Sequence, residues 1–122
     1  MESFYDKLGE ERLTQLLDSF YDKIFESESL RPLFLSTPKE EIKYKQKLFL
    51  TQFLGGPPKY TNEIGNPKMR QRHLHHKITV EAKDEWLKCM QEAIKELDWD
   101  DRSKYVLYTM FPKLAGHMVN SK

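Results

Sequence analysis

The chain has little cysteine and no long apolar run, and both absences limit its expected location. Cys89 is the only cysteine, so no disulfide can form within the chain, and a reducing compartment is favoured. No apolar stretch approaches the roughly 18 residues of a transmembrane helix, and the opening MESFYDKLGEER does not resemble a signal peptide. We therefore expect a cytoplasmic protein without a membrane partner.

An excess of either charge is missing as well. The 20 basic and 19 acidic side chains nearly cancel, which gives no electrostatic basis for binding nucleic acid. Hydrophobic residues make up 39% and aromatic residues 12% of the 122 positions, enough to form a core. This length predicts one domain over residues 1–122. No stretch has the alternation of a strand, so we predict an all-α fold with about six helical pieces.

The strongest helical pattern begins at Glu10. Apolar residues recur at helical spacing and predict an amphipathic helix to about Glu26; they are Leu13, Leu16, Leu17, Phe20, Tyr21, Ile24 and Phe25. Because Tyr21 lies within this stripe, we expect its ring to be buried and its hydroxyl to need a hydrogen-bond partner.

Weaker signals place the other helices. A short helix is predicted for residues 3–8 and a single helical turn for residues 30–34. Thr79 is suited to cap a helix that continues to about Leu97 and carries Trp86 on its apolar side. The last helical stretch contains Pro112, which should kink or split it.

Residues 37–74 form the most informative stretch. Thr37, Pro38 and Glu40 have the pattern of a capping box with proline at the first helical position, so we predict a helix that starts there. Gly55-Gly56 should end it. The glycine spacing fits no phosphate-binding loop, and helix termination explains it sufficiently.

One side of this predicted helix carries a polar residue where a core residue is expected. The residues on that side are Ile42, Gln46, Phe49 and Phe53. An amide on an apolar stripe costs free energy unless it is hydrogen bonded, so Gln46 calls for a partner. Tyr21 and Trp86 add two more polar ends on apolar stripes. Each is most often an ordinary core residue, but together the three suggest convergence on one small polar ligand.

The segment after the helix has no clear period. Residues 57–66 are predicted to be an irregular connection, which at this length is usually functional or disordered. A short helix is then predicted from Asn66 to about His73, with Met69 and His73 on one face. A histidine on an apolar face beside a long loop suits a flat ligand.

The histidines also allow two other interpretations. The set formed by His73, His75, His76 and His117 is a candidate zinc or nickel site, although no HExxH or CxxC motif accompanies it. His73 alone is also compatible with a core histidine that is hydrogen bonded to a backbone carbonyl. No Ser-His-Asp or Cys-His arrangement is detectable, so no catalytic residues are assigned.

Taken in order, these residues resemble the truncated haemoglobins, short globins with a two-on-two helical sandwich, and most closely their second group. The resemblance covers nearly the whole chain. The motifs that carry it are Phe20-Tyr21, Phe34, Lys45-Gln46-Lys47, the run from Phe49 to Pro58, Tyr60-Thr61, the run from Arg70 to Leu74, Trp86, and the run from His117 to Asn120.

The resemblance implies a cofactor and a set of ligands. Haem would be held by His73 as the proximal iron ligand, and the absence of CxxCH implies non-covalent haem b. Tyr21, Gln46 and Trp86 would be distal donors to a bound diatomic ligand. The further cofactor contacts that the resemblance implies are Phe34, Lys45, Phe49, Tyr60, Met69 and Arg72, with Lys45 and Arg72 near the propionates.

The chain departs from the family pattern at two positions. Ile42 stands where the residue that gates the distal pocket is usually small, so ligand entry is expected to be narrowed. Phe34 replaces a tyrosine found in some relatives, which removes one donor and leaves Tyr21 freer to reorient.

The preferred function is therefore binding of dioxygen and other diatomic ligands at a penta-coordinate iron, with slow release. Slow release fits redox handling of oxygen, nitric oxide or peroxide better than bulk oxygen transport. A nitric oxide dioxygenase or peroxidase-like activity would need a reductase that the sequence does not identify. The alternatives are a haem-based gas or redox sensor with a protein partner, and a cofactor-free helical interaction module. We expect a monomer or a homodimer.

Overall fold

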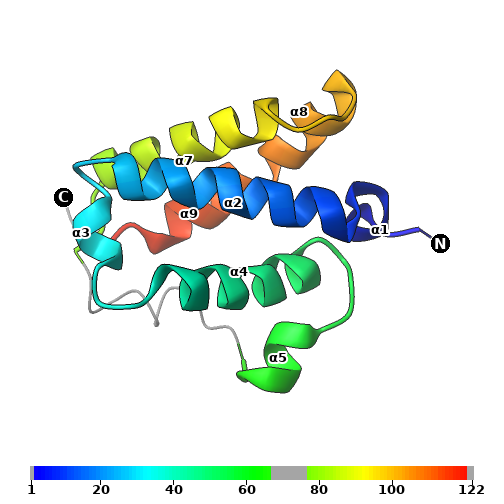
Figure 1. Cartoon of the computed structure of the whole chain (residues 1–122), viewed down its shortest axis with the longest axis horizontal. Coiled ribbons are helices and arrows are strands. Elements are labelled where there is room, and N and C mark those ends of the chain that lie inside the picture. The colour runs from blue at the N-terminus through cyan, green and yellow to red at the C-terminus, as the bar shows by residue number, and fades with distance from the viewer. Residues whose placement is uncertain (1, 67–76, 121–122) are drawn as a thin grey trace.

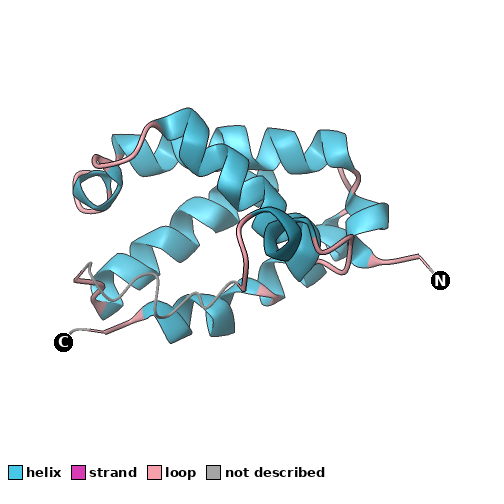
Figure 2. Cartoon of the chain, turned by 90° about the horizontal axis from the view of Figure 1, so that it is seen from below, coloured by secondary structure: helices cyan, strands magenta, loops and turns pink. Residues whose placement is uncertain are grey.

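The computed structural model describes residues 2–66 and 77–120, and in these ranges it contains helices and loops but no strand (Figure 2). This confirms the predicted all-α fold. The helices are α1 (Phe4–Leu8), α2 (Glu10–Glu26), α3 (Arg31–Phe34), α4 (Lys39–Phe53), α5 (Lys59–Glu63), α7 (Val80–Lys95), α8 (Asp101–Thr109) and α9 (Phe111–Met118). None of the described helices is long and apolar enough to span a membrane.

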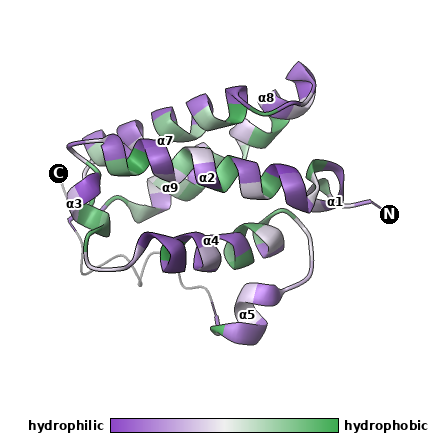
Figure 3. Cartoon of the chain, viewed as in Figure 1, coloured by the Kyte–Doolittle hydropathy of each residue, from purple (hydrophilic) through white to green (hydrophobic). Residues whose placement is uncertain are grey.

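Helix α2 occupies the centre of the structure, between α7 on one side and α4 on the other (Figure 1). It has the predicted bounds, and its apolar stripe is buried as expected. The chain enters it through Gly9, whose positive φ of 84° is readily adopted only by glycine. Hydrophobic and hydrophilic residues alternate along α2 and α7 in the pattern of amphipathic helices (Figure 3).

Two predictions about α4 had different outcomes. Its end was predicted correctly, because the helix stops at Phe53 and Gly55 has a φ of 93°. The predicted capping box at Thr37 was wrong. Pro38 has extended backbone angles and is itself the N-cap, with its carbonyl accepting from the Ile42 N–H at 3.1 Å. Thr37 thus lies one residue too early to cap the helix, and no side chain does so.

The prediction of an irregular connection over residues 57–66 was also wrong, because it contains α5. Five residues are too few to show a helical period, and only Tyr60 of this helix is buried. The Gln52 side chain attaches α5 to α4: its amide nitrogen donates to Thr61 Oγ1 at 2.9 Å, and its oxygen accepts from the Thr61 N–H at 3.0 Å. The predicted short helix from Asn66 to His73 lies outside the described residues.

In the C-terminal half, Thr79 and Pro112 have the effects that the sequence predicted, and α7 ends at Lys95, two residues before the predicted Leu97. Thr79 caps α7 by accepting a hydrogen bond from the Ala82 N–H at 3.0 Å. Asp100 caps α8 through the Ser103 N–H in the same manner. Pro112 does split the last helical stretch, because it lies in the first turn of α9 and the preceding helix ends at Thr109.

Candidate functional site

A cavity lies among α2, α3, α4, α7 and α9, which supply most of its wall. Its volume is about 220 Å³, and part of it is open to solvent. Its wall is mainly apolar; the apolar residues are Leu30, Leu33, Phe34, Ile42, Phe49, Ile78, Ala82, Leu114, Ala115 and Met118.

Three polar ends interrupt this apolar wall. Tyr21 from α2, Gln46 from α4 and Trp86 from α7 all line the cavity. None of the three side chains has a hydrogen bond to another described residue. The described part of the chain also has no buried side-chain nitrogen or oxygen atom without a partner. Their polar atoms therefore adjoin the open space of the cavity, where a ligand or water can meet them.

Tyr21 is well suited to donate a proton in a hydrogen bond. Its side chain is 3% exposed, and burial raises the pKa of its hydroxyl well above the ordinary value of 10.0. The phenol is therefore neutral across the physiological pH range and keeps its O–H.

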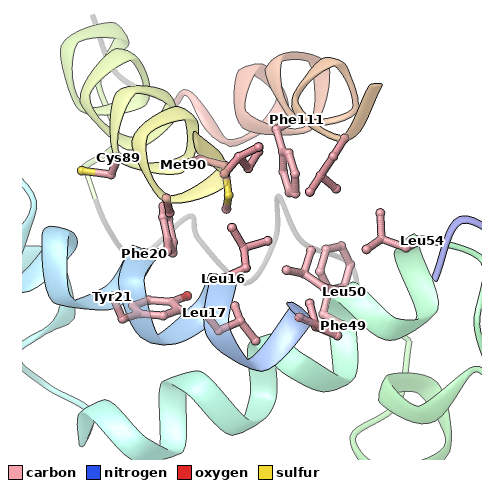
Figure 4. Close-up of a cluster of buried hydrophobic side chains, with 14 of the residues drawn as sticks. Leu16, Leu17, Phe20, Tyr21, Phe49, Leu50, Leu54, Cys89, Met90 and Phe111 are labelled. Atoms are coloured by element: carbon pink, nitrogen blue, oxygen red, sulfur yellow. The ribbon is translucent and has the colours of Figure 1, made fainter. Parts of the chain in front are cut away.

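Aromatic contacts fix the positions of two of these donors, Tyr21 and Trp86. The ring of Phe20, which is fully buried, meets Tyr21 edge-on at 4.9 Å and Trp86 edge-on at 5.0 Å between ring centroids. Phe34 also meets Tyr21 edge-on, at 6.1 Å between ring centroids, and Phe111 lies 6.0 Å from Trp86. Figure 4 shows Phe20 and Tyr21 on α2 within the buried cluster that also includes Phe111. The donors are thus packed against rigid rings rather than on mobile loops.

The other predicted site residues divide into three groups. Phe34, Ile42 and Phe49 line the cavity together with the three donors. Lys45 and Tyr60 do not: the Lys45 side chain is 50% exposed and pairs with Glu41 at 3.2 Å, and buried Tyr60 packs edge-on against Phe49 at 5.9 Å.

The remaining predicted residues lie outside the described ranges. They are His73, Met69 and Arg72, and the alternative ligands His75 and His76 lie there as well. The described residues contain no group of three potential metal-ligating side chains, and of the four histidines only His117 is described. The zinc or nickel alternative therefore stays a prediction.

Sequence reasoning found three polar residues of the cavity wall and missed three others. Ser36, Thr37 and Lys83 line it, and Ser36 is exposed to solvent. The Lys83 side chain is 25% exposed and pairs with Asp84 at 3.2 Å. The signal was present, because Lys83 precedes Trp86 by three residues and so shares its helix face. Thr37 had been assigned to capping instead.

Cys89 does not contribute to the cavity. It is buried in α7, and burial, with smaller effects of Glu85 and Glu92, raises the pKa of its thiol to about 11. Such a thiol is a poor nucleophile near neutral pH, which agrees with its lack of any predicted catalytic role.

The family model of bacterial-like globins matches residues 3–120. The chain belongs to this family. Among curated proteins, the globin is 44% identical over 116 residues to Group 2 truncated hemoglobin YjbI of Bacillus subtilis, covering 95% of this chain and 87% of the relative. It is 31% identical over 120 residues to Two-on-two hemoglobin-3 of Arabidopsis thaliana, covering 96% of this chain and 69% of the relative.

Solved structures agree with this assignment. The globin superposes on the truncated oxygen-avid haemoglobin from Bacillus subtilis with a TM-score of 0.91 at 43% identity, covering 97% of this chain and 99% of the other. The group II truncated hemoglobin from Bacillus anthracis gives a TM-score of 0.90 at 35% identity over 98% of this chain and 92% of the other. The predicted resemblance to truncated haemoglobins of the second group is confirmed.

Proposed function

We propose that this globin binds haem b non-covalently and, with it, dioxygen and other diatomic ligands that it releases slowly. The observation that carries the proposal is a mainly apolar cavity in which three polar ends, from Tyr21, Gln46 and Trp86, have no partner among the described residues. Membership of the globin family supports haem as the occupant, and the printed description of the Bacillus subtilis relative as oxygen-avid supports dioxygen as the ligand.

The chemistry of the cavity wall fits haem. A flat, mainly apolar macrocycle suits walls that contain the rings of Phe34 and Phe49. Its carboxylates suit a polar rim that carries the Lys83 cation and the exposed hydroxyl of Ser36. No CxxCH motif is present for covalent attachment. Lys45, Tyr60, Met69 and Arg72 stay proposed cofactor contacts that rest on the family resemblance.

When bound, haem would supply the iron that binds a diatomic ligand, and His73 is the residue that would hold this iron. The residues of the cavity determine how long the ligand stays. Tyr21 donates its O–H, Trp86 its indole N–H and Gln46 its amide N–H. If each hydrogen bond contributes about 0.5–1.5 kcal/mol, two or three slow release of dioxygen by roughly one to three decades.

Slow release suits redox handling of oxygen, nitric oxide or peroxide rather than bulk oxygen transport. Turnover of that kind requires a reductase, which we propose as a partner without naming it. We further propose a cytoplasmic monomer or homodimer. The single cysteine, which is buried, agrees with a reducing compartment.

The visible spectrum of the purified protein tests the proposal. After haem addition, the ferrous and ferrous–carbon monoxide forms should show a sharp Soret band that shifts on addition of carbon monoxide. Dioxygen release, followed after rapid mixing of the oxygenated protein with carbon monoxide, should be slow. A helical, cooperatively folded protein without a Soret band in the presence of haem would overturn haem binding. Release as fast as from cavities without donors would overturn the slow-release part.

A further inference from the structure

We propose that Lys39 is a positioning residue that holds the connection between α3 and α4 against α2, and thereby sets the rate at which diatomic ligands enter and leave the cavity. The connection consists of residues 35–38. The proposal rests on the proposed function and deepens it, because it assigns ligand access to a contact outside the cavity wall.

Lys39 makes two contacts with α2. Its ammonium nitrogen lies 2.6 Å from Asp22 Oδ1 and 5.5 Å from the centre of the Phe25 ring. An ion pair and a cation–π contact thus share one cation. Lys39 is the first residue of α4, so both contacts act on the point where the helix begins.

The other end of the connection is held by the same aromatic ring. Phe34, the last residue of α3, lies 6.3 Å from Phe25 between ring centroids. The four connecting residues are therefore anchored at both ends on Phe25. In the described part of the chain, their own side chains make no hydrogen bond or ion pair that would hold them independently.

The connection forms part of the cavity wall. Ser36 and Thr37 line the cavity, and because Ser36 is also exposed, this is a place where the cavity meets solvent. The Ile42 N–H donates to the Pro38 carbonyl at 3.1 Å, so the connection is joined directly to the turn of α4 that carries Ile42 into the cavity. A movement of residues 35–38 away from α2 would open this part of the wall.

Such an opening has a distinct kinetic signature. A ligand crosses the same barrier on entry and on exit, so lowering it raises the association and dissociation rates by the same factor and leaves Kd unchanged. Loss of a hydrogen bond from a cavity donor to the bound ligand has a different kinetic signature, because it raises mainly the dissociation rate. The ratio of the two rates therefore separates the role of Lys39 from that of Tyr21, Gln46 and Trp86.

The chain supplies a matched control further along α4. Lys47 pairs at 3.0 Å with Glu10, the first residue of α2, so this ion pair also joins α4 to α2. Its side chains are 35% and 63% exposed, against 34% and 65% for Lys39 and Asp22. Lys47 does not line the cavity. Its loss should affect folding stability to a similar extent without affecting ligand access.

The experiment compares the Lys39→Met and Lys47→Met variants, which keep an unbranched side chain of similar length and lose the charge. Carbon monoxide association and release are measured on the haem-loaded proteins by flash photolysis and ligand replacement. Lys39→Met should raise both rates about two- to fivefold with an unchanged ratio, the range expected for one exposed ion pair with a cation–π contact. Lys47→Met should leave both unchanged. High salt should raise the rates of the wild type toward those of Lys39→Met.

A haem-free measurement keeps this proposal separate from haem binding. In a Trp99→Phe background, Trp86 is the only tryptophan, and quenching of its fluorescence by acrylamide reports access of a small neutral molecule to the cavity. Quenching that is faster in Lys39→Met than in Lys47→Met supports the proposal, even if the protein fails to bind haem. Equal quenching, equal rates in the two variants, or a change in release alone would overturn it.

Discussion

Tyr21 on α2 and Trp86 on α7 contact the same aromatic ring. Phe20 meets each of them edge-on, at 4.9 and 5.0 Å between ring centroids. Phe20 is fully buried, so its ring has no room to reorient. Two hydrogen-bond donors from α2 and α7 are thereby held at a set separation on the cavity wall. Any small ligand in the cavity meets donors that are already in place, and little conformational entropy is lost in ordering them.

Replacing either donor should shorten the time that dioxygen stays bound. We expect Tyr21→Phe and Trp86→Phe to keep haem and to raise the rate of dioxygen release about threefold to tenfold each, because each loses about one hydrogen bond. Stopped-flow mixing of the oxygenated protein with carbon monoxide measures the rate. Tyr105→Phe, at a tyrosine that is 69% exposed, is the control and should change nothing. Unchanged release in both cavity variants would refute the donor model.

The proximal ligand can be tested in the same spectra. His73→Ala should lose the Soret band or bind haem much more weakly, because His73 is the proposed iron ligand. His75 or His76 could bind the iron in its place. The triple variant, with all three histidines changed to alanine, therefore distinguishes replacement by a neighbouring histidine from a wrong assignment of the iron ligand. His117→Ala is the control and should bind haem normally. Full haem binding by the triple variant would exclude these histidines as iron ligands.

Much of the fold followed from the sequence because long helices repeat their pattern several times. The apolar stripe of α2 recurs over 17 residues, and both of its bounds were predicted correctly. Helix α5 has five residues and a single buried side chain, so it presents no repeat to detect. It is joined to α4 by the side-chain amide of Gln52, a contact across nine positions that the local pattern does not encode.

The three hydrogen-bond donors of the candidate site were predictable from the sequence, but the residues that hold them in place were not. Gln46 stood out because an amide on an apolar stripe needs a partner. Phe20 looked like any other core residue, since nothing in the spacing reveals that it contacts two donors. No pattern in the sequence distinguishes Lys39, because its proposed role depends on its distances from Asp22 and Phe25, which only the packed structure supplies.

Gly56 should be intolerant of a side chain. A Cβ there would lie 2.6 Å from Tyr5 Cδ2 and 2.8 Å from the Thr51 carbonyl oxygen, and the backbone atom cannot move aside as a flexible side chain would. We expect Gly56→Ala to lower the free energy of unfolding by about 1–3 kcal/mol. Gly116→Ala is the matched control, because nothing lies within 4 Å of its added Cβ and the residue is helical. It should be neutral or stabilise by about 0.5–1 kcal/mol. Urea unfolding of both variants gives the comparison.

Acid should weaken the packing of α2 against the end of α7 through Glu96. Its carboxylate accepts hydrogen bonds from the Lys23 ammonium at 2.5 Å and the Ser19 hydroxyl at 2.6 Å, which lower its pKa below the ordinary value of 4.5. A carboxyl with a lowered pKa in the folded state stabilises the fold above its ordinary pKa. This contribution is lost as the pH falls from about 4.5 through the lower folded value, because the unfolded chain takes up the proton more readily.

Glu96→Gln should therefore be less stable than the wild type at pH 7, and the difference should shrink steadily as the pH falls below about 4.5. The midpoint of urea unfolding is measured at pH values on the order of one unit apart, from pH 3 to pH 7, and follows this difference in stability directly. Glu28→Gln is the control, because Glu28 has no hydrogen bond or ion pair to any residue that the structure describes. Its midpoint should follow the wild type at every pH. If the stability of Glu96→Gln differed from that of the wild type by the same amount at every pH, the substitution would act through packing rather than through the carboxylate charge that binds Lys23.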